Sequence, residues 1–196
     1  MLEPRSVGVE HVALSAMREI GLIEELERPG FKRAQCAAAI GNVIARMAQP
    51  GSELATWRWL RNESTLGEMM RFDFEAMALM RLYRASDLLL RHRASIEAFI
   101  FERVRGLFGL ECTVTLYDLT NTYFEGEMKG STKAARGHSK EKRAECLLLA
   151  LGLVLDQSGF VRRSQVFAGN ALEACARSCA SSAAAPARST LAAAAS

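Results

Sequence analysis

The chain has 196 residues, of which 49% are hydrophobic and 24% are charged, and its formal net charge is +3 at pH 7. This composition excludes an intrinsically disordered protein and is sufficient for one or two folded domains. The longest apolar run, residues 146–155, is far shorter than the roughly 20 residues that span a bilayer. We therefore expect no membrane segment.

The amino terminus and the cysteines favour a reducing compartment. Residues 1–9 contain Glu3 and Pro4 and lack a basic segment followed by an apolar run, so no secretory signal is expected. The five cysteines include no C-x-x-C pair and are interpreted as reduced thiols that act as small apolar residues. A cytoplasmic location is the default expectation.

The first half of the chain has the apolar spacing of helices. The expected helices cover residues 9–20, 32–48, 52–61, 65–83 and 86–108. Ser52 is expected to cap the third helix, and Thr65 and Glu68 have the spacing of a capping box at the start of the fourth. His92 lies on the apolar face of the last helix, either as a packed residue or as a ligand. Residues 1–110 are thus predicted to be a helical region.

The pattern changes to alternation at residue 111. A strand rich in β-branched residues is predicted over residues 111–118, and Asp118 stands at its end. Residues 146–155 and 160–167 predict a second and a third strand, and Asp156 is interpreted as a turn residue between them. The sequence predicts an α+β protein whose three strands form an antiparallel meander within residues 111–170.

Basic residues cluster between the first two predicted strands. The cluster, here called the basic loop, consists of Lys129, Lys133, Arg136, Lys140, Lys142 and Arg143. Such a patch can neutralise several phosphates and would make DNA binding depend on salt. A solvated basic loop without a partner is the alternative, and the composition by itself favours this alternative.

Several motifs resemble those of one protein family. They are Y-D-L-T-N-T-Y-F-E-G at residues 117–126, R-G-H-S-K-E-K-R at 136–143, L-G-L-V-L-D at 151–156 and V-F-A-G-N at 166–170. Together with A-Q-P-G-S-E-L-A-T at residues 48–56 and L-Y-R-A-S-D at 82–87, they resemble the DDE transposases of bacterial insertion sequences. The resemblance covers residues 9–170.

The resemblance implies a ribonuclease-H-like catalytic domain, incomplete in this chain, after a helical region that engages transposon DNA or a second protomer. Asp118 matches the first of three catalytic carboxylates, which in this family hold Mg²⁺ ions for phosphodiester cleavage and strand transfer. The other two carboxylates are not identified in this sequence. Glu125 and Glu127 follow the first strand directly and match neither of them.

After residue 170 the sequence becomes rich in alanine and serine. Residues 171–196 show no strand pattern, and they are expected to be a disordered tail or the product of a shifted reading frame. The expected function is that of a truncated transposase that is inactive alone. The alternatives are a remnant that binds DNA or interferes with a transposase, and a general helical interaction protein. Transposon-end DNA, a second copy of the chain and a full-length transposase are the expected partners.

Overall fold

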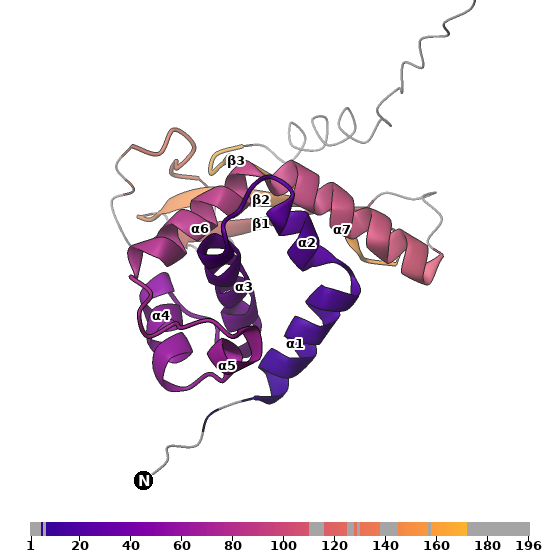
Figure 1. The fold of residues 1–196 in the computed structure, drawn as a ribbon. Coiled ribbons are helices and arrows are strands. Elements are labelled where there is room, and N and C mark those ends of the chain that lie inside the picture. The colour runs from indigo at the N-terminus through magenta and orange to yellow at the C-terminus, as the bar shows by residue number, and fades with distance from the viewer. Residues whose placement is uncertain are drawn as a thin grey trace, which may run out of the picture. The chain divides into compact units, whose positions relative to one another are not determined.

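The computed structural model describes residues 5, 7–109, 116–124, 128, 130–137, 145–156 and 158–171. The chain separates into two compact units, Met1–Phe108 and Gly109–Ser196. The described part of the first unit is helical, and that of the second contains a three-stranded sheet (Figure 1). The α+β class is confirmed. No helix within the described ranges is both long enough and apolar enough to cross a membrane.

Helix α3 is the centre of the helical unit. The helices are α1 (Gly8–Glu19), α2 (Leu22–Glu27), α3 (Arg33–Ala48), α4 (Glu53–Asn62), α5 (Leu66–Met70), α6 (Met80–Arg91) and α7 (Arg93–Phe108). α3 contacts α1, α2, α4 and α6, and its residues 36–42 are all buried (Figure 1). This stretch consists mainly of alanine and glycine, which let neighbouring helices approach closely. At Gly41, an added Cβ would lie 3.0 Å from the Leu60 side chain.

The first three predicted helices are confirmed, with boundaries that differ by at most one residue. Ser52 is the N-cap of α4, and its hydroxyl oxygen accepts a hydrogen bond of 3.3 Å from the Ala55 amide. Helix α2 was not predicted from the sequence. It begins after Gly21, which has a φ of +75°, so the chain reverses there and starts a new short helix.

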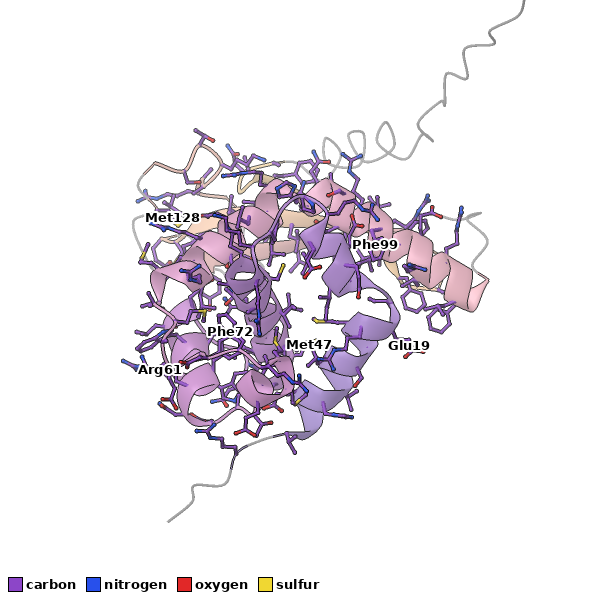
Figure 2. The ribbon with its side chains drawn as sticks, in the orientation of Figure 1. Glu19, Met47, Arg61, Phe72, Phe99 and Met128 are labelled. Atoms are coloured by element: carbon purple, nitrogen blue, oxygen red, sulfur yellow. The ribbon has the colours of Figure 1, made fainter. Side chains whose placement is uncertain are left out.

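The predicted helix over residues 65–83 is wrong. Helix α5 ends at Met70, because Arg71 adopts a left-handed conformation with φ +51° and the helix closes in a Schellman motif. The amide of Arg71 bonds to the Glu68 carbonyl, and that of Phe72 bonds to the Gly67 carbonyl. The expected capping box is also wrong, since Thr65 makes no side-chain capping hydrogen bond. Phe72 instead packs edge-on against Phe74, with ring centroids 5.0 Å apart (Figure 2).

The predicted helix over residues 86–108 is two helices. His92 has φ −97° and ψ 10°, which ends α6, and α7 starts at the next residue. The imidazole ring contacts the ring of Phe31 edge-on at a centroid distance of 5.5 Å. His92 is therefore a packed residue at a helix junction, which agrees with the first of the two interpretations of the sequence.

The sheet has the predicted meander order. Strands β1 (Leu116–Phe124), β2 (Leu147–Leu155) and β3 (Val161–Ala168) pair antiparallel in the order β1-β2-β3. Burial alternates along β2, where residues 148, 150, 152 and 154 are buried. The second and third predicted strands are confirmed within one residue.

The position of the first strand differs from the prediction. β1 continues through Phe124, which pairs with Leu147, so pairing with the whole of β2 extends the strand past Asp118. Residues 111–115, the start of the predicted strand, lie outside the described residues. The predictions for Lys129, Lys140, Lys142 and Arg143, and for the tail beyond Ala171, also lie outside them.

Candidate functional site

Asp118 is the third residue of β1. Its main chain pairs with Leu153 of β2, within an uninterrupted register that runs from Leu116 opposite Leu155 to Phe124 opposite Leu147. The sequence prediction that Asp118 ends the strand is wrong. The residue lies inside the paired region, so the backbone that carries it is fixed by strand pairing on the β2 side.

No metal centre is formed by the side chains that the structure describes, which do not include that of Asp118. Among them, no three His, Cys, Asp or Glu side chains gather in a way that could hold a metal ion. Mg²⁺ requires a near-octahedral oxygen shell, to which proteins usually contribute one or two carboxylates. Glu125 and Glu127 lie outside the described residues.

Asp156 is the carboxylate that follows β2, and it is committed to the turn. The residue is 1% exposed, and its Oδ1 accepts hydrogen bonds of 2.9 Å from the amides of Ser158 and Phe160. The Asp156 amide in turn donates to the Phe160 carbonyl. These bonds are those of a turn-forming aspartate, which confirms the role predicted from the sequence.

Two members of the basic loop, Lys133 and Arg136, are described. The Lys133 ammonium donates a 2.8 Å hydrogen bond to the Val166 carbonyl of β3, and the Lys133 carbonyl accepts one from the Gly169 amide. Ala135 exchanges two backbone hydrogen bonds with Leu148. The end of the basic loop is thus fixed to the sheet beside the end of β3, and Arg136 projects from this fixed segment as an exposed residue.

Two glycines make this attachment sterically feasible. A Cβ on Gly137 would collide with the carbonyl oxygen of Gly169, and a Cβ on Gly169 would collide with those of Leu148 and Ala135. Sequence reasoning treated both glycines only as parts of loops or motifs. The V-F-A-G-N motif was the available signal for Gly169, because a glycine directly after a strand often marks a close backbone approach.

The structure does not bring Asp118 and the attached end of the basic loop together. Asp118 is aligned with Leu153 on one side of β2, and Ala135 is aligned with Leu148 on the other side. At about 3.4 Å per residue, the two positions are roughly 17 Å apart along the strand.

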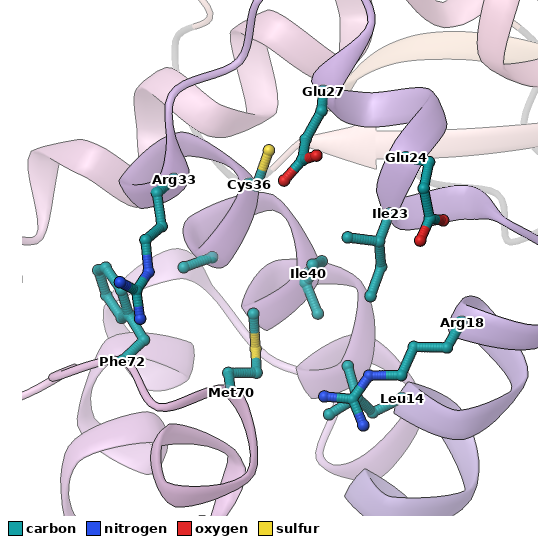
Figure 3. A pocket seen from close by; sticks show the side chains of 11 residues that line it. Leu14, Arg18, Ile23, Glu24, Glu27, Arg33, Cys36, Ile40, Met70 and Phe72 are labelled. Carbon is teal, nitrogen blue, oxygen red and sulfur yellow. The ribbon is translucent and has the colours of Figure 1, made fainter.

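The helical unit contains a separate cavity of about 470 Å³ (Figure 3). Its lining residues are Leu14, Arg18, Ile23, Glu24, Glu27, Arg33, Cys36, Ala37, Ile40, Met70 and Phe72. Burial, followed by the nearby charge of Glu27, raises the pKa of the Cys36 thiol above its ordinary value. Sequence reasoning missed this site, because its walls come from segments far apart in the chain and one of them is the unpredicted α2.

No family model, no curated protein and no solved structure matches this chain. The resemblance to transposases therefore rests on the motif residues themselves. Parts of three of these motifs lie in β1, β2 and β3.

Proposed function

We propose that this chain is a fragment related to DDE transposases and that it does not cleave DNA by itself. The observation that carries the proposal is the position of the Y-D-L-T-N-T-Y-F-E-G motif. Its residues 117–124 lie in the first strand of an antiparallel meander. The resemblance implies that the first strand of a ribonuclease-H-like domain carries a catalytic carboxylate.

In this proposal Asp118 is one carboxylate of a site that needs three. When bound in a complete site, Mg²⁺ would stabilise the negative charge that develops at a phosphodiester. The described side chains form no group of three that could hold a metal ion, and the Oδ1 atom of Asp156 is occupied by the turn. Cleavage is accordingly assigned to the complete family members and not to this chain alone.

The alternative is a non-catalytic remnant that binds DNA or interferes with a complete transposase. The attached end of the basic loop favours this alternative, because Arg136 is exposed and follows a backbone segment that is hydrogen-bonded to β2 and β3. Because this backbone is already fixed, less backbone freedom is lost when the Arg136 guanidinium contacts a phosphate. Pairing with a second copy or with a complete transposase belongs to the same proposal.

DNA binding can be measured by fluorescence anisotropy of a labelled duplex over a salt series. The logarithm of the affinity should fall linearly with the logarithm of salt, and Arg136→Gln should reduce the slope by about 1. Arg105→Gln is the matched control, since Arg105 is exposed and pairs with Glu102 in the helical unit. Absence of salt-dependent binding would contradict the proposal that the chain binds DNA.

Cleavage is tested separately with supercoiled DNA in Mg²⁺ or Mn²⁺. We expect no nicking by the chain alone, and the same result for Asp118→Asn. Nicking by the wild-type chain that disappears in Asp118→Asn would show an active enzyme and contradict the proposed inactivity. A complete transposase mixed with increasing amounts of this chain should lose activity if the chain interferes with it.

A further inference from the structure

The cavity of the helical unit carries charges of both signs on different elements. Glu24 and Glu27 are three residues apart on α2, so their side chains share one face of that helix. Arg18 and Arg33 reach the cavity from α1 and α3. Figure 3 shows these four side chains around a central apolar floor that includes Ile40.

The two arginines converge on one short segment. The Arg18 guanidinium donates a 3.3 Å hydrogen bond to the Met69 carbonyl, and the Arg33 guanidinium donates one of 2.6 Å to the Arg71 carbonyl. The acceptors are two residues apart, so both guanidinium groups are oriented by the chain around Met70. Each guanidinium has five N–H donors, and a single carbonyl leaves most of them available to a ligand.

The acidic residues do not neutralise the arginines. In the part of the chain that the structure describes, no ion pair joins Glu24 or Glu27 to Arg18 or Arg33. One side of the cavity therefore presents two carboxylates, and the segment around Met70 is flanked by two guanidinium groups. The net formal charge of the four residues is zero.

We propose that this cavity binds a small zwitterionic ligand with an apolar body, of the chemical class of short peptides with free ends and apolar side chains. The ammonium group would contact Glu27 and the carboxylate would contact Arg33, while Glu24 and Arg18 carry the same charges on α2 and α1. A ligand with only negative groups would meet the two glutamates, and one with only positive groups would meet the two arginines. Matching both charged regions requires both signs in one molecule.

The apolar floor selects the body of the ligand. Ile23 and Met70 are the partly exposed apolar residues of the lining, and Leu14 and Ile40 lie buried beneath them. A cavity of about 470 Å³ lies within the range of roughly 300–1,000 Å³ that small-molecule sites occupy. The ligand site lies within the helical unit and is independent of the DNA-binding proposal.

The test uses the full chain and the dipeptide Leu-Leu as probe, with binding followed by isothermal titration calorimetry. We expect saturable one-to-one binding with a dissociation constant on the order of 1 mM or lower. Acetylation of the amino end or amidation of the carboxyl end should each weaken binding by about three- to fivefold, as loss of an exposed ion pair predicts. Inorganic phosphate should not compete.

The matched variants separate charge recognition from nonspecific apolar binding. Glu27→Gln should weaken binding of Leu-Leu while leaving the affinity of the acetylated probe unchanged, and Arg33→Gln should do the same with the amidated probe. Glu102→Gln and Arg105→Gln, which change residues outside the cavity lining, should bind Leu-Leu like the wild type. No saturable binding at about 10 mM probe would overturn the proposal. Equal affinity for Leu-Leu and both capped probes would also overturn it.

Discussion

Gly137 lies against Gly169 so closely that a Cβ atom on Gly137 would collide with the Gly169 carbonyl oxygen. This contact joins the end of the basic loop to the segment that follows β3. The same region contains the paired hydrogen bonds between Ala135 and Leu148. Because neither glycine has a side chain, the loop backbone can pair with Leu148 of β2, just past the end of β3.

Gly169→Ala should open this attachment. The added methyl group would collide with two backbone carbonyl oxygens, those of Leu148 and Ala135, which cannot move away as a flexible side chain could. Overpacking of this kind costs about 1–3 kcal/mol. Hydrogen exchange measured by mass spectrometry should show faster exchange of the Ala135 and Leu148 amides in the variant.

Gly106→Ala is the control for the loss of glycine itself. Gly106 lies in α7 with no atom within 4 Å of an added Cβ, so alanine should stabilise the helix by about 0.5–1 kcal/mol. Its hydrogen exchange should slow in α7 and remain unchanged at Ala135 and Leu148. Unchanged exchange at these two amides in Gly169→Ala would show that the attachment tolerates a side chain.

The turn between β2 and β3 should depend on the Asp156 side chain. Asp156→Ala removes the acceptor of the Ser158 and Phe160 amides, and each lost hydrogen bond costs about 0.5–1.5 kcal/mol. Asp156→Asn retains an acceptor oxygen and should cost less. Exchange of the Ser158 and Phe160 amides should therefore increase strongly in the alanine variant and weakly in the asparagine variant. Equal exchange in both variants would contradict the role of the Oδ1 acceptor.

A buried amide connects α3 to α6. The Asn42 side chain donates hydrogen bonds to the Leu82 carbonyl at 3.0 Å and to the Ser86 hydroxyl at 3.2 Å. Asn42→Ala should lower the free energy of unfolding of the helical unit by about 1–3 kcal/mol, because the Leu82 carbonyl loses a partner and a small cavity forms. Asn62→Ala, at an exposed position in α4, should change it by less than about 0.5 kcal/mol.

Urea unfolding followed by tryptophan fluorescence measures this effect in the relevant unit. Both tryptophans of the chain belong to α4, and Trp59 is buried there. A midpoint for Asn42→Ala equal to that of Asn62→Ala would contradict a stabilising role of the amide.

Local patterns in the sequence predicted the central elements of this fold. The apolar spacing of α3, the Ser52 cap and the apolar runs of β2 and β3 each depend on neighbouring residues, and each predicted element is found in the structure. The ends of α5 and β1 depend on other information. Arg71 takes a left-handed conformation that glycine usually provides, and β1 extends beyond Asp118 because β2 offers partners as far as Leu147.

The candidate sites show the same division between local and tertiary information. Asp118 could be selected from the sequence because a motif surrounds it, but its place inside the strand follows from pairing with Leu153. The cavity could not be predicted, since Arg18 and Arg33 converge only through their bonds to the carbonyls of Met69 and Arg71. Contacts of this kind are set by how helices pack and leave no periodic signal in the chain.

Cys36 should make the stability of the helical unit depend on pH above about 9. The thiol is 4% exposed, and burial and then the nearby Glu27 carboxylate raise its pKa from the ordinary value of 9.0. As pH rises past 9.0, the unfolded chain releases the Cys36 proton while the folded chain retains it. The unfolded state then binds fewer protons, so the free energy of unfolding falls with pH until the folded thiol also ionises.

Replacement of the thiol isolates this contribution from the other groups that titrate at high pH. Cys36→Ala should be less stable than the wild type at pH 7, because it leaves a cavity, yet it should lose less stability between about pH 8.5 and pH 10. Urea unfolding followed by tryptophan fluorescence at a series of pH values gives both slopes. Glu27→Gln should reduce the wild-type slope only in part, since burial is the larger cause of the raised pKa of Cys36. Parallel pH profiles for the wild type and Cys36→Ala would show that the buried thiol does not contribute to this loss of stability.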